Sequence, residues 1–160
     1  MNHSFSVIYR LADAGDTSRL SALLWEQITE FDQHNAELKD EYIDDCRNHI
    51  DSRLGKDLFC FIAEEDGLIV SHIFILITPK LPKLGRPNAS YARLSSVRTI
   101  PEYRNKGIGG ALMNNVISFC KEKKAEEIIV WPSQDSVGYY EGAGFSSKNK
   151  IMEIEFFSGY

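Results

Sequence analysis

Residues 97–112, VRTIPEYRNKGIGGAL, carry the strongest structural signal in the sequence. A strand-like run stops at Ile100, a tight turn follows at the proline, and a glycine-rich loop then opens an apolar-striped helix. A helix N-terminus presents amides without intrahelical partners and a partial positive charge, which suits phosphate. The glycines let the main chain approach an anion closely. This stretch therefore predicts a strand–loop–helix unit that binds a phosphate-bearing ligand.

Two common nucleotide-binding motifs do not match this loop. The dinucleotide fingerprint G-x-G-x-x-G needs a third glycine where the sequence has Leu112. The phosphate loop G-x-x-x-x-G-K-[ST] needs a Gly-Lys-Ser/Thr run, and none follows a suitable glycine. A glycine-rich turn that only packs a helix closely against a strand is the structural alternative for the loop taken by itself.

Strand-like and helix-like segments surround this unit on both sides. Asp16 is expected to cap the first helix, Gly55 to end the second in a left-handed conformation, and Asp66-Gly67 to turn a hairpin. The order βααβββαβαβ predicts one α/β domain over residues 1–160. The expected strands cover 5–11, 58–63, 68–78, 91–100, a short buried one at 128–131, and 151–157, and the expected helices begin at Asp16 with an apolar stripe to Phe31, near Tyr42, at Gly107 and at Ser133.

Composition narrows the functional class. The 160 residues carry 18 Lys and Arg against 23 Asp and Glu, a net charge of −5 without a basic stripe, which disfavours nucleic-acid binding. No apolar run approaches the ~20 residues of a membrane span, and no signal sequence is visible, so a cytoplasmic protein is expected. The three cysteines lack metal-ligand spacing, and no metal site is predicted.

Two motifs together resemble those of a known family. Arg104-Asn-Lys-Gly-Ile-Gly109 matches the R/Q-x-x-G-x-G/A signature of GNAT (GCN5-related) N-acetyltransferases, and Tyr140-Glu-Gly-Ala-Gly-Phe145 matches their Y-E-x-x-G-F signature. The two motifs stand in the family's order, with a helix and a strand expected between them. The resemblance is sharp over residues 91–157, whereas the N-terminal half agrees only in its element order.

The resemblance implies a fold and a cofactor site. The fold is a mixed, mainly antiparallel sheet flanked by helices, with a V-shaped splay between the strands at 92–100 and 127–131. Acetyl-CoA would lie in this splay, its pyrophosphate on the glycine-rich loop and its pantetheine arm along the strand edge. The implied cofactor-binding residues are Val97, Arg98, Thr99, Arg104, Asn105, Lys106, Gly107, Ile108, Gly109, Gly110 and, in place of the family's usual asparagine, Ser133.

The resemblance also assigns Tyr140 as the acid that protonates the leaving thiolate, with packing against the cofactor as the alternative role. The family's usual carboxylate base is absent, because the central strand reads LSSVRT at 94–99. Entry of an already neutral amine would make a base unnecessary. The candidates left open are Ser95 or Ser96 positioning a water, and Glu26, Glu30 or His72 acting from neighbouring elements.

The expected activity is acetyl transfer from acetyl-CoA to a primary amine of an unidentified, small substrate. Acidic residues crowd the segment 26–45, which is either a solvated helix face or a negative field that attracts a cationic amine. Acetylation of a protein lysine or N-terminus, and a catalytically weak acyl-CoA sensor, are the alternatives. A homodimer is expected from the resemblance and from the apolar Phe156-Phe157 pair.

Overall fold

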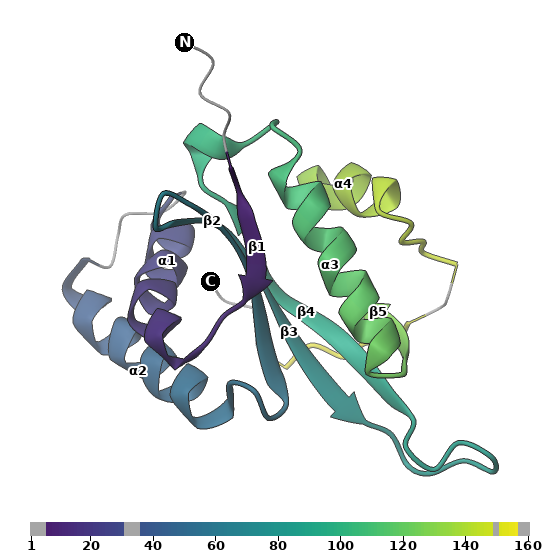
Figure 1. Ribbon diagram of the computed structural model, residues 1–160. Helices are drawn as coiled ribbons and strands as arrows, with labels where there is room; N and C mark the ends of the chain where they lie inside the picture. The colour runs from purple at the N-terminus through teal and green to yellow at the C-terminus, as the bar shows by residue number, and fades with distance from the viewer. Residues whose placement is uncertain (1–5, 31–35, 149–150, 157–160) are drawn as a thin grey trace.

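A computed structural model describes residues 6–30, 36–148 and 151–156, which form helices on both faces of a five-stranded sheet (Figure 1). Short 3-10 turns precede several helices and also follow β4, where η3 spans Pro101–Tyr103. The elements in chain order are β1 (Ile8–Leu11), α1 (Thr17–Thr29), α2 (Lys39–Arg53), β2 (Leu58–Glu65), β3 (Leu68–Pro79), β4 (Ser90–Thr99), α3 (Ile108–Glu122), β5 (Ala125–Ile129) and α4 (Val137–Gly142).

The sheet follows the order β1-β2-β3-β4-β5, with antiparallel pairs throughout except for the parallel pair β4–β5. This confirms the predicted mixed, mainly antiparallel sheet. Helices α1 and α2 cover one face, and α3 and α4 lie on the other (Figure 1). Each face has its own buried apolar cluster, so the sheet is the shared wall between two cores.

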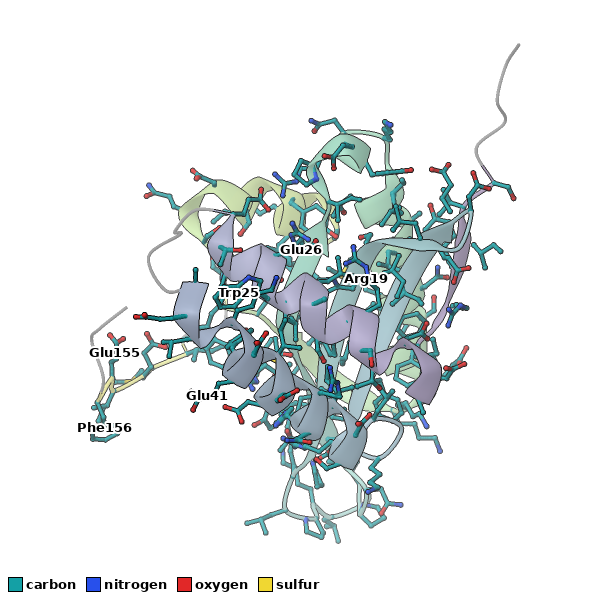
Figure 2. All side chains as sticks on the ribbon, turned by 90° about the vertical axis from the view of Figure 1, so that its left-hand side faces the viewer. Arg19, Trp25, Glu26, Glu41, Glu155 and Phe156 are labelled. Carbon is teal, nitrogen blue, oxygen red and sulfur yellow. The ribbon has the colours of Figure 1, made fainter. Side chains whose placement is uncertain are left out.

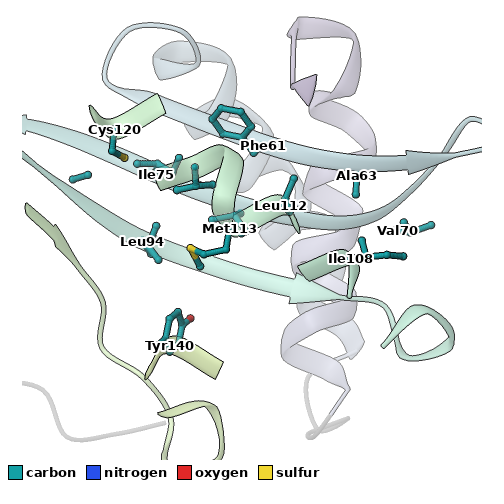
Figure 3. Close-up of a cluster of buried hydrophobic side chains, with 13 residues drawn as sticks. Phe61, Ala63, Val70, Ile75, Leu94, Ile108, Leu112, Met113, Cys120 and Tyr140 are labelled. Carbon is teal, nitrogen blue, oxygen red and sulfur yellow. The ribbon is translucent and has the colours of Figure 1, made fainter. Parts of the chain in front are cut away.

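Helix α3 supplies the larger core. Leu112 and Met113 are fully buried, and the fully buried Val116 follows about one helical turn later, so the three form one apolar stripe against the sheet (Figure 3). The helix crosses the sheet so that this stripe meets Ile73 and Ile75 of β3 in the same cluster. The sequence periodicity that predicted this helix is therefore the contact surface that fixes it in place.

The turn between β2 and β3 has the predicted hairpin geometry. Asp66 and Gly67 both adopt positive φ angles, 49° and 78°. Two consecutive residues with positive φ match the right-handed twist of the flanking strands, which explains the preference for Asp-Gly at this turn.

The start of α1 differs from the expectation. Asp16 stands at the N-cap position, but its side chain makes no capping bond to the helix. It accepts hydrogen bonds from the guanidinium of Arg10 and from the main-chain amide of Asp13 instead. Asp13 caps the 3-10 turn that precedes the helix. The expected apolar stripe packs against the core at Leu20, Leu23 and Leu24, whereas Ile28 is exposed and Phe31 lies outside the described residues.

The C-terminal strands are the second correction. The strand expected at 128–131 lies at Ala125–Ile129 and is β5. Its residues are exposed or half-buried, whereas a buried strand was expected. The described part of the expected strand at 151–157, residues 151–156, is not a strand, and the Ile151, Met152, Ile154 and Phe156 side chains are exposed by 59–93%. Alternating apolar residues form a strand only where an edge supplies hydrogen bonds. Within the described residues, the Trp131 indole donates a hydrogen bond to the Glu153 carboxylate of this segment at 3.0 Å.

A buried polar chain joins α1 to the centre of the sheet. The Ser96 hydroxyl donates to Gln27 Oε1 at 2.7 Å and lies 3.0 Å from His72 Nε2. Because the hydroxyl has one proton, Nε2 is the donor in the second bond. Burial, with a smaller contribution from the charge of Arg98, lowers the pKa of His72 to about 3, so the imidazole is neutral in the folded protein.

None of the described helices has the length and apolarity that crossing a bilayer requires.

We expect Leu112→Ala to lower the free energy of unfolding by about 3 kcal/mol, because it removes a fully buried side chain and leaves a cavity against the sheet. Leu81→Ala is the matched control, since this leucine is exposed in the loop after β3 and should change stability by less than about 0.5 kcal/mol. Urea unfolding of both variants measures the difference. Equal effects would contradict the packing of α3 described above.

The neutral His72 makes stability depend on pH. The unfolded chain binds a proton at this residue near pH 6.5, whereas the folded protein resists protonation down to about pH 3. Stability is therefore full above pH 6.5 and falls below it, by about 2 kcal/mol between pH 8 and pH 5 from this residue. His72→Gln, which does not titrate, should flatten the pH profile of urea unfolding by that amount. An unchanged profile would show that the imidazole is not buried and neutral.

Candidate functional site

The strands β4 and β5 part from each other halfway along β4. Their last paired residues are Arg93 and Ile129, and β4 continues through Leu94–Thr99 with no partner on that side among the described strands. At the same point the register with β3 shifts, which leaves the exposed Ser95 without a partner residue. Such a bulge bends the strand and increases its twist. The predicted splay between these two strands is present and begins at the bulge.

The main chain of β4 presents hydrogen-bonding groups to the open side. Ile100 donates its amide proton to the Val70 carbonyl, so these two residues form a hydrogen-bonded pair of the antiparallel ladder. Such pairs alternate along the ladder. Arg98 therefore also points its amide and carbonyl toward β3, whereas those of Val97 and Thr99 point into the splay. Of these, the Thr99 carbonyl already accepts a bond from the Arg104 guanidinium.

The glycine-rich loop forms an uncapped helix N-terminus beside this edge. Asn105 and Gly107 both have positive φ, 59° and 80°, and Gly107 is the N-cap of α3. No side chain caps the helix, and its first turn contains no acidic residue. The first intrahelical bond at this end runs from the Ala111 amide to the Gly107 carbonyl. The amides at 108–110 are therefore available to an acceptor from outside the helix.

Gly109 is the point of closest approach between α3 and its neighbours. A Cβ atom there would lie 3.3 Å from Thr99 Oγ1 and 3.6 Å from the Tyr139 hydroxyl. That hydroxyl donates to the Gly109 carbonyl at 2.8 Å and so ties α4 to the first turn of α3. The small residue lets strand, loop helix and α4 converge on one spot.

Arg104 fixes the loop from its other side. Its Nε donates to the Thr99 carbonyl at 2.9 Å. Its Nη2 lies 2.6 Å from Oε1 of Glu30, the residue that follows the last turn of α1. The ammonium of Lys106 lies over the Tyr103 ring at 4.9 Å. The basic residues of the loop thus position it in addition to making it electropositive.

Tyr140 faces the core from α4. Its ring packs edge-to-face against Tyr139 and Phe145 and is turned toward Leu94 and Met113 (Figure 3). Its hydroxyl forms no hydrogen bond with any residue that the structure describes. Burial raises the pKa of Tyr140, so the phenol stays protonated at neutral pH and is able to donate a proton.

Ser133 lies at the surface after β5, whereas two of the candidate bases belong to the polar chain at the centre of the sheet. Ser133 begins a 3-10 turn after β5, where its hydroxyl donates to Ser136 Oγ, and it is exposed. Of the possible bases, Ser96 and His72 belong to the buried chain with Gln27, and His72 binds a proton only at acid pH.

The two glutamates named as candidate bases are also committed to partners. Glu26 pairs with Arg19, and Glu30 pairs with Arg98 and Arg104. Burial opposes ionisation of Glu30, but hydrogen bonds and charge from the two arginines outweigh it and lower the pKa of this carboxyl. Glu30 is therefore ionised, and both glutamates are held in ion pairs. Ser95, exposed at the bulge, is the candidate without such a commitment.

Sequence reasoning missed a pocket on the opposite side of β4. It has a volume of about 310 Å³ and lies between α1, the end of β4 and the turn after it. The spacing of Arg19, Glu26 and Glu30 along α1 was the available signal, since steps of seven and four residues place side chains on one helix face. Its lining residues are Arg19, Glu26, Thr29, Glu30, Arg98, Ile100, Pro101 and Glu102.

No group of three or more His, Cys, Asp or Glu side chains among the described residues is placed to hold a metal ion. The geometry instead converges on an electropositive, uncapped helix start, an open strand edge and a buried phenol. These features lie on the consecutive elements β4 and α3 and on α4, which follows after β5.

Curated relatives match part of the chain. Glucosamine 6-phosphate N-acetyltransferase of Trypanosoma brucei brucei is 27% identical over 95 residues, which cover 59% of this chain and 63% of that protein. The probable N-acetyltransferase family 8 member 5 of Mus musculus is 30% identical over 97 residues, 59% of this chain and 41% of its own length. The chain thus spans less than two thirds of either relative.

Solved structures match nearly the whole fold. A predicted acetyltransferase of Clostridium acetobutylicum, solved with acetyl-CoA, aligns with a TM-score of 0.74 at 22% identity, over 94% of this chain and 96% of that one. Glucosamine-6-phosphate N-acetyltransferase of Arabidopsis thaliana aligns with a TM-score of 0.70 at 21% identity, over 95% and 99%. These likenesses show a common fold.

The model of the acetyltransferase (GNAT) family matches residues 19–145, which include α1, the whole splay, the glycine-rich loop and α4. The match therefore covers both faces of the sheet and every element that forms the candidate site. This chain belongs to the GNAT acetyltransferase family.

Proposed function

We propose that the protein transfers an acetyl group from acetyl-CoA to a primary amine. The observation that carries this proposal is the uncapped N-terminus of α3 beside the open edge of β4. The helix start offers amides without intrahelical partners, which suit phosphate. The strand edge offers the main-chain groups of Val97 and the amide of Thr99, whose carbonyl is bonded to Arg104, and these suit an amide-containing chain.

In this proposal the pyrophosphate of acetyl-CoA accepts hydrogen bonds from the main chain of 104–110. Asn105 and Gly107 provide the left-handed turns that direct successive amides toward one point. The pantetheine arm extends along β4 and bonds to the main chain of Val97 and Thr99. Arg98 borders this edge, although its own main-chain groups face β3. Ser133 would contact the arm through its hydroxyl.

The reaction forms a C–N bond and breaks a C–S bond. A neutral amine attacks the thioester carbonyl, the resulting oxyanion collapses, and the thiolate leaves while the new ammonium loses its proton to solvent. Tyr140 donates its phenolic proton to the thiolate, and the resulting phenolate regains a proton from solvent. The assignment is supported by the hydroxyl, which makes no hydrogen bond to a described residue, and by burial, which raises the pKa and keeps the phenol protonated before the transfer. Most candidate bases are held in ion pairs or in buried hydrogen bonds and are therefore not free to accept a proton. For this reason we propose that the amine enters already neutral.

The exposed segment 151–156 supports the expected homodimer, because its apolar side chains would be buried against a second copy. Protein acetylation and an acyl-CoA sensor without turnover are the other functions compatible with the same loop. They are distinguished from the proposed function by CoA release with small amines.

The cofactor site is tested by calorimetric titration with acetyl-CoA. We expect saturable one-site binding that is at least about tenfold weaker in Gly107→Glu, which places a carboxylate on the anion-binding turn. Gly85→Glu is the matched control, since Gly85 also has a positive φ and open space around it but lies in the loop after β3. Equal losses in both variants, or no binding by the folded wild type, would contradict the proposed site.

The role of the phenol is tested with Tyr140→Phe. We expect kcat for CoA release to fall by at least about tenfold while acetyl-CoA affinity is unchanged, because only the proton is removed. Tyr139→Phe is the comparison, since it removes the bond to Gly109 and should weaken cofactor binding more than turnover. Full activity in Tyr140→Phe would leave this residue with packing alone, and absence of turnover in the wild type would favour the sensor.

A further inference from the structure

A large aromatic side chain lies exposed at the point where β4 and β5 part. Trp131 follows the end of β5 by two residues, and 53% of its surface is exposed. The guanidinium of Arg93, which belongs to the last residue pair of the two strands, lies 5.6 Å from the centre of the indole. An exposed tryptophan beside a candidate active site is informative, because large apolar surfaces are usually buried.

The indole is held by two polar partners. The guanidinium of Arg93 over the ring makes a cation–π contact, and the indole N–H donates to the Glu153 carboxylate at 3.0 Å. Fixing an exposed side chain costs conformational entropy, and a ligand that binds to an already fixed ring does not have to offset that cost again. The Trp131 ring is therefore preorganised as a contact surface.

Trp131 and Arg93 lie on the face of the sheet that α1 and α2 cover. Side chains alternate along a strand, and the two neighbours of Arg93, Ala92 and Leu94, belong to the core under α3. Arg93 therefore points to the other face, and Trp131 contacts it there. Tyr140 lies on the α3 side, turned toward Leu94 (Figure 3). The proposed proton donor thus occupies one face of the sheet, and the exposed indole lies on the other.

The proposed path of acetyl-CoA ends beside this ring. The pyrophosphate is proposed to bind the main chain of 104–110, and the pantetheine arm to follow the open edge of β4 from Thr99 through Val97. That edge ends at Arg93, where the pairing with β5 begins. The arm therefore carries its acetyl group away from the loop and toward the start of the splay, and the acceptor amine has to meet it there.

We infer that Trp131 is a specificity-determining residue for the acceptor, whose amine is attached to a ring that stacks on the indole. The inference rests on the proposed function for its identification of the ligand as an acceptor. A flat ring covers more of the indole than an open-chain amine does, and the gain grows with the apolar area removed from water. The ring is a sugar or an aromatic group, since both present an apolar face. Arg93 and Glu153 act through the indole as positioning residues.

The first experiment observes the indole without turnover. The sequence has two tryptophans, and Trp25 of α1 lies elsewhere, with its ring 5.8 Å from that of Tyr42 on α2 (Figure 2). Trp25→Phe assigns the two indole N–H signals in a nitrogen–proton NMR spectrum. Glucosamine, 2-phenylethylamine and ethanolamine are then titrated into the wild-type protein in the presence of CoA, which carries no acetyl group to transfer.

We expect the Trp131 signal to shift saturably with one or both ring amines, and the tighter of the two identifies a sugar or an aromatic acceptor. The Trp25 signal and the ethanolamine titration are the controls and should show no saturable shift. A Trp131 signal unmoved by both ring amines at millimolar concentrations would overturn the inference. A signal that moves only with protein concentration would also overturn it, because a second copy would then cover the indole.

The second experiment measures CoA release with the preferred ring amine. Trp131→Ala should raise KM for this amine by at least about tenfold, with kcat and the KM for acetyl-CoA little changed, because only a contact to the acceptor is removed. Trp131→Phe should recover part of the loss, since an aromatic face remains.

Tyr91→Ala is the matched control for these variants. Tyr91 also has a cation near its ring, Lys80 at 6.0 Å, and it lies on the same face of β4 as Arg93, before the splay begins. Equal rises of KM in Trp131→Ala and Tyr91→Ala would overturn the assignment to Trp131.

The two proposals fail separately. Acetyl transfer that prefers ethanolamine to both ring amines, with an unmoved Trp131 signal, would overturn the stacking surface and leave acetyl transfer intact. A Trp131 signal that saturates with a ring amine, without CoA release with any amine, would support the surface and contradict the proposed activity.

Discussion

The parting of β4 from β5 is the constraint on which the candidate site depends. A parallel pair that stops at Arg93 and Ile129 leaves the second half of β4 with main-chain groups that no strand satisfies. The bulge at Ser95 bends the strand where the pairing stops. The open edge then lies beside the uncapped start of α3, so two sets of unpaired main-chain groups face one region.

A chain of ion pairs connects the two faces of the sheet at this end. Glu30 after α1 holds both Arg98, which is buried on one side of β4, and Arg104, which belongs to the loop. Solvent screens such pairs less than surface pairs, and burial also costs desolvation, so removing one partner would leave the other charge buried and uncompensated. The position of the loop therefore depends on α1 as well as on the strand that precedes it.

The buried polar groups at the centre of the sheet have a structural role. His72 is held neutral between β3 and α1, where its bond to Ser96 satisfies a donor that burial would otherwise leave unpaired. Its low pKa follows from desolvation, and a base with that pKa would be a weak acceptor of an ammonium proton at neutral pH. The same residue therefore contributes to acid sensitivity and not to proton transfer.

Local patterns in the sequence determined the α3 stripe at Leu112–Val116, the Asp66-Gly67 turn and the glycine-rich loop, because periodicity, turn geometry and helix ends depend on neighbouring residues. Asp16, the position of β5 and the segment 151–156 could not be predicted in this way. The side chain of Arg10 on β1 takes the Asp16 carboxylate away from the helix, and the presence of a partner strand decides the other two. The same holds for Arg98. Its place next to Glu30 and its unbonded Nη1 arise from segments far apart in sequence, which only the tertiary structure brings together.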